Sequence, residues 1–389
     1  MIDAGSPLGE SQSEVNLSDI DFDAVLVSHP HQDHYGLIDN LDPTMPVYIG
    51  RLSRSLIGAA RMFTGREGLA NRFVNIKAWK DFKVGPFKVH TYLVDHSSPE
   101  AFAFLIEAKG KRLFYTGDFR AHGRKSKVFD QMIKDPPRDI DALIMEGTML
   151  GRSNEEFPDE KSVEAKIYEV IKKQDAITFL LCSSQNIDRV VGAYRACKRA
   201  GKIMVVDAYT AWVLEQMKQV SNHVPEMTWP EVKVYVPKAQ YNIIATHRNY
   251  FGEFARLIFS REVRIKKEQV HEKSNDILFI TRPSQYRTIE PHIKAGPINI
   301  IYSMWLGYLD DPRYARQNSK AAAYRTDPRC NFIYAHTSGH ATVKDLKLFA
   351  DAINPKLLVP IHTEKKDEYA KHFEPNQVKV FADGENFQI

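Results

Sequence analysis

The chain has 389 residues and a mass of 44.5 kDa, which is too long for one ordinary domain and fits two. Hydrophobic residues make up 43% of it and charged residues 26%, a composition that is typical of globular proteins and excludes a largely disordered or fibrous chain. The formal net charge of +4 is compatible with a polyanionic partner but does not require one, because a mild excess of Lys and Arg is common in enzymes.

The first 150 residues are rich in predicted strands. Apolar alternation and short apolar runs predict strands at 22–27, 88–94, 101–107, 112–115 and 142–145. The Ala-Lys-Gly-Lys sequence at 108–111 is a hairpin turn signal. Helices are expected at 33–40 and at 53–63, the second of which is amphipathic.

After Gly151, helices and strands alternate. Helices are predicted at 161–173, 186–200, 211–220 and 248–258, and strands at 177–181, 203–206, 277–280 and 298–301. This order favours a parallel sheet with helices on its faces.

From about residue 326 the pattern of the first part returns. We expect a strand at 332–334, a helix at 343–352, a strand at 357–361, a helix at 365–372 and short strands near 377–389. The predicted organisation is therefore one domain, 1–155 and 326–389, split by an inserted domain at 156–325.

The strongest chemical signal is Ser-His-Pro-His-Gln-Asp-His at 28–34, directly after a predicted strand. Neutral imidazoles and a carboxylate are ligands for Zn²⁺, and also for Mn²⁺ or Fe. A loop leaving a strand can direct His29 and His31 at one point, while Asp33 and His34 in the next helical turn face a second point. A polar surface loop with incidental histidines is a poor alternative for four potential ligands so close together.

Further potential ligands follow other predicted strands: His96, Asp118 and His362. A histidine after a strand is, taken alone, more often a surface or capping residue. Together with the first cluster these residues complete two sites, His29/His31/His96 and Asp33/His34/His362, with Asp118 shared. Two cations roughly 3.5–4 Å apart lower the pKa of a shared water and stabilise negative charge, so the predicted reaction class is metal-assisted hydrolysis.

These motifs resemble those of the metallo-β-lactamase superfamily: the His-x-His-x-Asp-His run at 29–34, His96, Asp118 in Tyr-Thr-Gly-Asp-Phe, and His362 in Pro-Ile-His-Thr-Glu. The resemblance implies an αββα sandwich with a two-metal site at one edge of its two sheets. The metals expected are two divalent cations, Zn²⁺ in preference to Mn²⁺, and Asp33 is counted as catalytic as well as a ligand.

Two further motifs resemble the β-CASP nucleases. Glu146 in Glu-Gly-Thr lies where that branch places an acidic residue, and His336-Thr-Ser-Gly-His340-Ala is similar to a run of ribonuclease J-like enzymes. The resemblance implies a β-CASP domain, a parallel sheet flanked by helices, inserted at 156–325. His340 is expected to protonate the leaving 3′-oxygen, with Glu146 orienting its ring. The alternatives are a turn histidine and a carboxylate that caps a turn.

Two loops are candidates for contacts with the substrate's phosphates. The resemblance to ribonuclease J-like enzymes implies that His336, Thr337 and Ser338 hold phosphates, including a 5′-terminal one, which favours a 5′-to-3′ exonuclease. Ser183, Ser184 and Asn186, with Arg189 one turn later, lie at a predicted helix N-terminus, where phosphate binds readily. The alternatives are a tight turn at 338–339 and ordinary Ser and Asn capping.

The N-terminus departs from the superfamily pattern, because an Ile-Asp-Ala-Gly motif that is normally preceded by strands occurs here at residues 2–5. An edge hairpin is expected to be missing: either the chain begins downstream of its natural start, or the first sheet is shortened and its next strand is exposed as an edge. The missing hairpin would affect stability more than metal ligation.

The function predicted from the sequence is hydrolysis of phosphodiester bonds in nucleic acid, with RNA favoured over DNA. One alternative is a hydrolase of a small ester, thioester or lactone. The other is a non-catalytic nucleic-acid-binding homologue.

Cytoplasmic location is expected from three widely spaced cysteines without a Cys-x-x-Cys pair, and neither a signal peptide nor a membrane span is expected.

Overall fold

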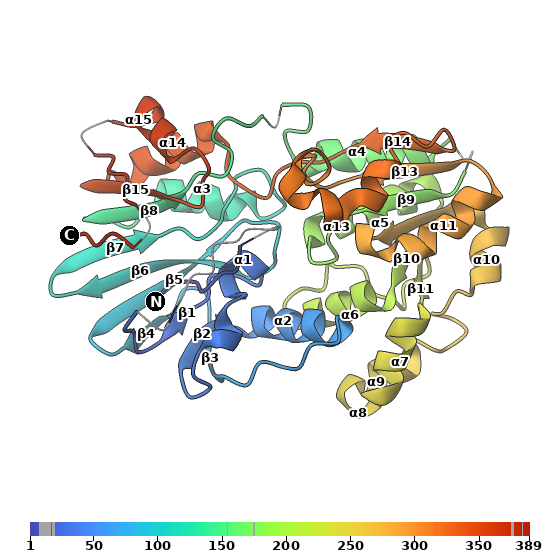
Figure 1. Ribbon diagram of the computed structural model, residues 1–389, viewed down its shortest axis with the longest axis horizontal. Coiled ribbons are helices and arrows are strands. Elements are labelled where there is room, and N and C mark those ends of the chain that lie inside the picture. The colour runs from blue at the N-terminus through green and yellow to red at the C-terminus, as the bar shows by residue number, and fades with distance from the viewer. Residues whose placement is uncertain (8–16, 18–19, 154, 174–175, 375–376, 383) are drawn as a thin grey trace.

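The computed structural model describes residues 1–7, 17, 20–153, 155–173, 176–374, 377–382 and 384–389. They form two lobes that lie side by side along the long axis of the molecule, with both chain ends in the first lobe (Figure 1). None of the helices in these residues is long and apolar enough to cross a membrane.

The first lobe contains two sheets. The smaller is parallel, in the order β1 (Val25–Leu26), β2 (Pro46–Gly50) and β3 (Arg72–Ile76). The larger has the order β15-β8-β7-β6-β5-β4. Its strands are β4 (Asp81–Val84), β5 (Phe87–Val94), β6 (Ala101–Ala108), β7 (Lys111–Tyr115), β8 (Ala142–Glu146) and β15 (Leu357–Ile361). Lys109 and Gly110 turn the β6–β7 hairpin with positive φ angles, as the predicted turn requires.

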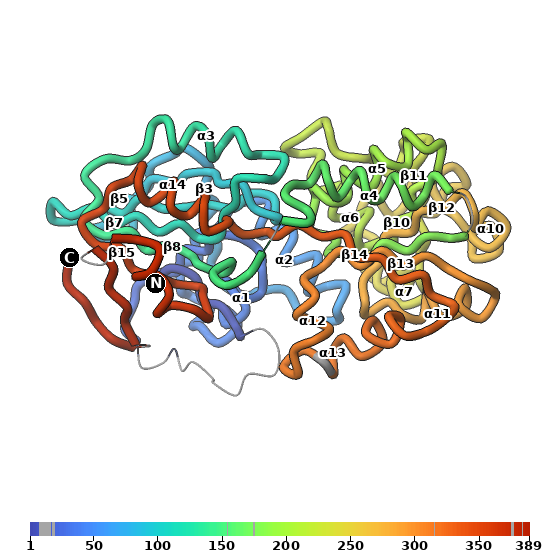
Figure 2. The backbone as a smooth tube through the Cα atoms, turned by 90° about the horizontal axis from the view of Figure 1, so that it is seen from above, coloured from blue at the N-terminus to red at the C-terminus, as the bar shows by residue number. Residues whose placement is uncertain are grey.

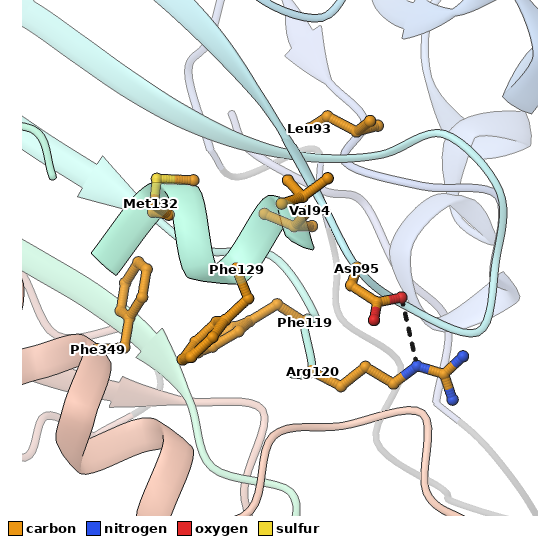
Figure 3. A pocket seen from close by; sticks show the side chains of 9 residues that line it. Leu93, Val94, Asp95, Phe119, Arg120, Phe129, Met132 and Phe349 are labelled. Atoms are coloured by element: carbon orange, nitrogen blue, oxygen red, sulfur yellow. Dashed lines mark ion pairs between the residues drawn. The ribbon is translucent and has the colours of Figure 1, made fainter. Parts of the chain in front are cut away.

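Helices cover the outer face of each sheet. They are α1 (Gln32–Tyr35), α2 (Arg51–Phe63), α3 (Ser126–Lys134), α14 (Val343–Ile353) and α15 (Tyr369–His372). Phe129, Met132 and Phe349 of α3 and α14 pack on the larger sheet, as Figure 3 shows beside the Asp95–Arg120 ion pair. A separate apolar core, including Leu26, Ile76 and Phe104, lies between the two sheets. These layers are the predicted αββα sandwich.

The second lobe is built on a parallel sheet in the order β11-β10-β12-β9-β13-β14. Its strands are β9 (Thr178–Leu181), β10 (Ile203–Asp207), β11 (Val232–Tyr235), β12 (Ile277–Thr281), β13 (Ile298–Tyr302) and β14 (Cys330–Tyr334). The central strands are continuous apolar runs because helices bury both faces of the sheet.

One or more helices precede or connect the strands of the second lobe. They are α4 (Glu160–Ile171), α5 (Ile187–Ala200), α6 (Ala208–Met217), α7 (Lys238–Thr246), α8 (Arg248–Phe251), α9 (Glu253–Leu257), α10 (Lys267–Glu272), α11 (Tyr286–Ala295), α12 (Gly307–Asp310) and α13 (Pro312–Ala323). Helix α5 illustrates the local rules, since the Asn186 side chain caps its first turn and Gly201 ends it with a left-handed φ of 66°.

Three expectations about single elements were wrong. The strand at 332–334 pairs with β13 of the second lobe instead of returning to the first. The helix at 248–258 is broken in two at Gly252, whose φ is 53°. Beyond residue 376, the described residues make only an isolated bridge, Leu358 with Val378.

Two segments connect the lobes, one running forward before α4 and one returning after β14, as the tube in Figure 2 shows. Helices α2 and α6 also lie side by side across the junction (Figure 1). We propose an inserted domain that begins near residue 156 and ends after Tyr334 instead of at 325, because β14 completes the sheet of the second lobe.

Candidate metal centre

Strand directions explain why residues far apart in the sequence meet. Strands β7, β8 and β15 are parallel, and β5 runs in the same direction because two antiparallel pairings separate it from β7. Their carboxyl ends therefore share one edge of the sheet. Each predicted ligand beyond the 28–34 loop follows one of these ends: His96 after β5, Asp118 after β7 and His362 after β15.

The first group of ligands is His29, His31, His96 and Asp118, whose ligand atoms all lie within 4.8 Å of one another. His31 Nδ1 is 3.0 Å from His29 Nε2 and 3.2 Å from His96 Nε2. One Asp118 oxygen, Oδ2, lies 3.7 Å from His29 Nε2 and 3.9 Å from His96 Nε2.

The second group is Asp33, His34 and His362, again with all ligand atoms within 4.8 Å. His362 Nε2 is 3.2 Å from Asp33 Oδ2. Asp118 joins this group to the first, since its Oδ2 is 3.2 Å from His34 Nε2 and its Oδ1 is 3.5 Å from His362 Nδ1. The structure thus brings all seven predicted ligands into one cluster.

This arrangement fits bound cations better than hydrogen bonds. One proton on His31 Nδ1 can satisfy only one of its two close imidazole contacts, whereas a cation between the three nitrogens satisfies them all. His34 Nε2 and Asp118 Oδ1 are buried and make no hydrogen bond. Buried polar atoms without partners are rare, and a metal ion is one of the ordinary explanations. The cluster is therefore capable of binding divalent metal ions.

The charges of the cluster point the same way. Burial lowers the pKa of His29 and His96 well below its usual range and that of His31 to about 4, which leaves neutral imidazoles able to ligate. Burial also acts to lower the pKa of His362, but the Asp118 and Asp33 carboxylates outweigh it and raise that pKa to about 9. A proton held between carboxylates marks a position that a cation takes when it binds.

Asp3 and Ser28 orient two of the ligands. Asp3 Oδ2 accepts a hydrogen bond from His34 Nδ1 at 2.7 Å, which turns Nε2 towards Asp118. The Ser28 hydroxyl donates to Asp3 Oδ2 at 2.8 Å and so accepts from His29 Nδ1 at 3.0 Å. Tyr115 holds the same Asp3 oxygen. Asp3 was not among the predicted site residues, although its position in the Ile-Asp-Ala-Gly motif was a usable signal.

Thr148 was also missed. Its hydroxyl donates to the backbone carbonyl of His362 at 3.0 Å and accepts from His362 Nδ1 at 2.7 Å, which leaves Nε2 free to ligate. His362 has a φ of 48°, an uncommon conformation for a residue with a side chain, so this contact also holds a strained backbone. His96 is fixed similarly, with Nδ1 2.6 Å from the Gly339 carbonyl.

His340 and Glu146 lie together at the same centre. Glu146 is fully buried, and its carboxylate accepts hydrogen bonds from Phe119 N at 2.9 Å and His340 Nδ1 at 3.0 Å. Burial acts to lower the pKa of His340, but the Glu146 and Asp118 carboxylates outweigh it and raise that pKa above its ordinary value. With Nδ1 bound to Glu146, the other ring nitrogen is available to the cleft.

A cleft of about 1070 Å³ opens over the centre between the two lobes. Its walls include ligands His31, Asp33, Asp118 and His362, together with His340. Of the predicted substrate contacts, Ser183, Asn186, His336 and Ser338 also line it.

Three predicted substrate residues face the interior instead. Thr337 is fully buried, and Ser184 is 2% exposed and bonded to Thr210. Arg189 is 1% exposed and pairs with Glu160, with Nε 3.0 Å from Oε2. The helix N-terminus signal was misleading for Arg189 because its carboxylate partner lies 29 residues away on another helix.

Buried arginines hold the 336–340 loop in place. Arg189 donates to the Thr337 carbonyl at 3.4 Å and Arg120 to the Ser338 carbonyl at 3.0 Å. Both arginines also bind Glu160 at the start of α4. The loop that carries His340 is thus tied to both lobes.

Comparison with known proteins agrees with this geometry. The profile described as a beta-lactamase superfamily domain matches residues 2–165, and one described as a Zn-dependent metallo-hydrolase RNA specificity domain matches residues 329–382. Proteins named Ribonuclease J are similar: those of Mycoplasma genitalium (25% identical, 92% of this chain and 59% of the relative), Mycoplasma pneumoniae (25%, 88% and 58%) and Sinorhizobium meliloti (24%, 88% and 57%). The chain spans less than two thirds of the length of these relatives.

The fold also matches that of a crystal structure of a protein of unknown function from Enterococcus faecalis V583, with a TM-score of 0.71, 20% identity, and 92% of this chain and 79% of that chain covered. Its likeness extends across both lobes. Together with the sequence motifs and the matched domains, these findings show that the chain belongs to the metallo-β-lactamase superfamily, in its β-CASP, ribonuclease J-like branch.

Proposed function

We propose that the protein is a two-metal hydrolase that cleaves phosphodiester bonds in nucleic acid, with RNA favoured over DNA. The observation that supports this most is the convergence of seven potential ligands, three on each side of Asp118. Four of the seven line a cleft that is also lined by His340. RNA is favoured because relatives over most of this chain are named Ribonuclease J and the matched C-terminal domain is described as RNA-specific.

Two divalent cations are proposed, Zn²⁺ in preference to Mn²⁺. His29, His31 and His96 would hold one, Asp33, His34 and His362 the other, with Asp118 between them. When bound, such cations polarise phosphoryl oxygens and lower the pKa of a coordinated water.

His340 is proposed as the general acid for the leaving 3′-oxygen. Glu146 holds its Nδ1, and the buried carboxylates favour the protonated ring, so a proton is available at the face that meets the cleft. Asp33 would contribute to catalysis by holding the second cation together with His34 and His362. Ser183, Asn186, His336 and Ser338 would contact phosphates along the same cleft.

The cleft argues against the first alternative, a small ester, thioester or lactone substrate. The cleft, about 1070 Å³, is lined by residues of both lobes, from Asp33 and His362 at the metal centre to Ser183 and Trp305. A nucleic-acid strand can contact this whole lining, whereas a small ester would contact only a part of it. The second alternative, a non-catalytic binding protein, is disfavoured because the ligand set is intact.

End-labelled RNA and DNA of one sequence, incubated with each metal in turn, test the function. We expect cleavage of RNA by the wild type and His90→Gln, a surface histidine outside the cleft, and none by His31→Ala or Asp33→Asn, with circular dichroism unchanged. Cleavage unaltered in the last two would contradict the proposal. Turnover of a chromogenic ester without nuclease activity would support the first alternative, and RNA binding without metal or cleavage the second.

A 5′-to-3′ exonuclease mode is favoured because Ser338 and His336 line the cleft near the centre. RNA with a 5′-monophosphate should then be degraded faster than its 5′-hydroxyl counterpart, and equal rates would remove this part of the proposal.

A reducing, cytoplasmic location is also proposed, because Cys182, Cys197 and Cys330 are buried free thiols.

A further inference from the structure

Three aromatic side chains form one wall of the cleft beside the metal centre. Trp305 follows β13, Tyr308 lies in α12 and Tyr314 in α13, and all three line the same cleft as Asp33 and His362. Their ring centroids are 5.4 Å apart for Trp305–Tyr308, 6.0 Å for Trp305–Tyr314 and 5.2 Å for Tyr308–Tyr314. None of the seven ligands requires this cluster for its own orientation.

The three rings pack against one another and against the backbone. Each pair of rings meets edge to face, with interplanar angles of 76–87°. Gly307 lies against the indole, since a Cβ there would be 2.2 Å from a Trp305 ring atom. A larger residue at 307 would displace Trp305, so the chain maintains this ring position with a glycine.

Packing alone does not explain the cluster. Tyr302 and Tyr324, which belong to the core of the same lobe, are 0% and 5% exposed. Trp305, Tyr308 and Tyr314 are only partly buried and border open space. Aromatic rings at the wall of a cleft present apolar area that a ligand with planar rings can cover.

An arginine adds a guanidinium plane to this wall. The Arg152 guanidinium lies over the Trp305 ring, 4.2 Å from its centroid, and also lines the cleft. Arg152 is held there by Glu364, at 3.3 Å, and Glu364 also pairs with Arg313 at 2.7 Å. Arg313 pairs with Asp311 as well, so the charges of these four side chains balance, and Arg152 contributes its guanidinium plane beside the indole.

We propose that Trp305, Tyr308 and Tyr314, with Arg152, form a subsite that stacks an unpaired nucleobase of the substrate next to the metal centre. Aromatic rings and arginine planes are the groups on which proteins stack the bases of single-stranded nucleic acids. Duplex bases are already stacked and gain nothing from such a wall. The inference rests on the proposed function and narrows its substrate to a strand that is unpaired at the cleft.

The test is a double-mutant cycle between protein and ligand. Single-stranded RNA decamers with phosphorothioate linkages, which slow hydrolysis, are prepared intact or with one abasic position scanned along the strand. Base–aromatic stacking is worth about 1–3 kcal/mol, so Trp305→Ala should weaken binding of the intact strand about 5- to 150-fold. At the position whose base stacks on this wall, removing the base should weaken binding to the wild type by the same factor as Trp305→Ala does. Removing the same base should weaken binding to Trp305→Ala hardly any further.

Controls separate this subsite from general effects. Trp79→Ala removes another exposed tryptophan, 45% exposed and outside the cleft lining, and should bind like the wild type. Trp305→Phe should recover most of the affinity, and binding of a duplex of the same sequence should not respond to Trp305→Ala. If Trp305→Ala does not fold, Tyr314→Ala is used in the same cycle.

The subsite would be overturned if the losses of affinity from Trp305→Ala and from base removal added at every position. It would also be overturned if Trp305→Ala and Tyr314→Ala bound the strand like the wild type. Neither result would affect the proposed nuclease activity of the wild type. A wild type that neither binds nor cleaves nucleic acid would overturn the proposed function and the subsite together.

Discussion

Replacing Glu160 with glutamine should destabilise the protein strongly although it leaves the metal ligands untouched. The Glu160 side chain is 3% exposed and pairs with two fully buried guanidiniums, Arg120 Nη1 and Arg189 Nε, each at 3.0 Å. In Glu160→Gln, Arg120 keeps Asp188 as a carboxylate partner. Arg189 has no other carboxylate partner among the described residues, so its charge stays buried and unpaired.

The magnitude follows from two independent estimates. Removing one partner of a buried pair costs about 3–5 kcal/mol. Burial acts to raise the pKa of Glu160, but Arg189 and Arg120 outweigh it and lower that pKa from its ordinary 4.5 to about 2. That shift corresponds to about 3 kcal/mol of folding free energy near neutral pH.

The pH dependence has a definite sign. Because the folded pKa is the lower one, this stabilisation is fully present above pH 4.5 and is lost as the pH falls towards 2. At about pH 3.5 roughly 1.4 kcal/mol of it should be gone. Glu160→Gln lacks the titrating group, so the difference between wild type and variant should shrink by that amount.

Urea unfolding between pH 7 and 3.5 measures this difference. Glu169→Gln, on the same helix, is the matched control, because its pair with Lys172 is exposed and worth roughly 0–1 kcal/mol. A Glu160→Gln effect as small as the control, or one that stays constant with pH, would refute the assignment of a buried ion pair that joins the lobes.

Three other predictions concern the centre. Thr148→Val should weaken the binding of one metal equivalent about 10- to 100-fold by competition titration, with Thr148→Ser close to wild type, since only the hydroxyl fixes His362; equal affinities would exclude that role. His340→Gln should lower kcat about 10²- to 10⁴-fold while RNA affinity persists. An unchanged kcat would show that His340 is not the general acid. Chelation should lower the melting temperature and Zn²⁺ should restore it in a concentration-dependent way, whereas a melting temperature insensitive to metal would contradict ligation in the folded state.

Much of the first lobe could be predicted because its signals are local. The strands at 88–94 and 101–107 alternate clearly, and the 28–34 loop holds four ligands within one short segment. Strands β2, β3 and β4 were not predicted, because β2 is bounded by Pro46 and Gly50 and because few residues of β3 and β4 are buried. Apolar periodicity is weak in such elements.

The failures arise where a property depends on a distant partner. The pattern of β14 predicts a strand but not its neighbour, and the neighbour, β13, decides to which lobe it belongs. Arg189 lies at a helix N-terminus, which suggested a contact with phosphate, yet its guanidinium is buried in an ion pair with Glu160. Asp3 and Thr148 act through His34 and His362, contacts that span 31 and 214 positions in the chain and leave little local trace.

Anomalous diffraction from crystals grown with Zn²⁺ tests the central claim most directly. Two strong peaks roughly 3.5–4 Å apart, with an Asp118 carboxylate oxygen between them, are expected. A single peak, peaks outside this cluster, or none at saturating Zn²⁺ would contradict a two-metal centre.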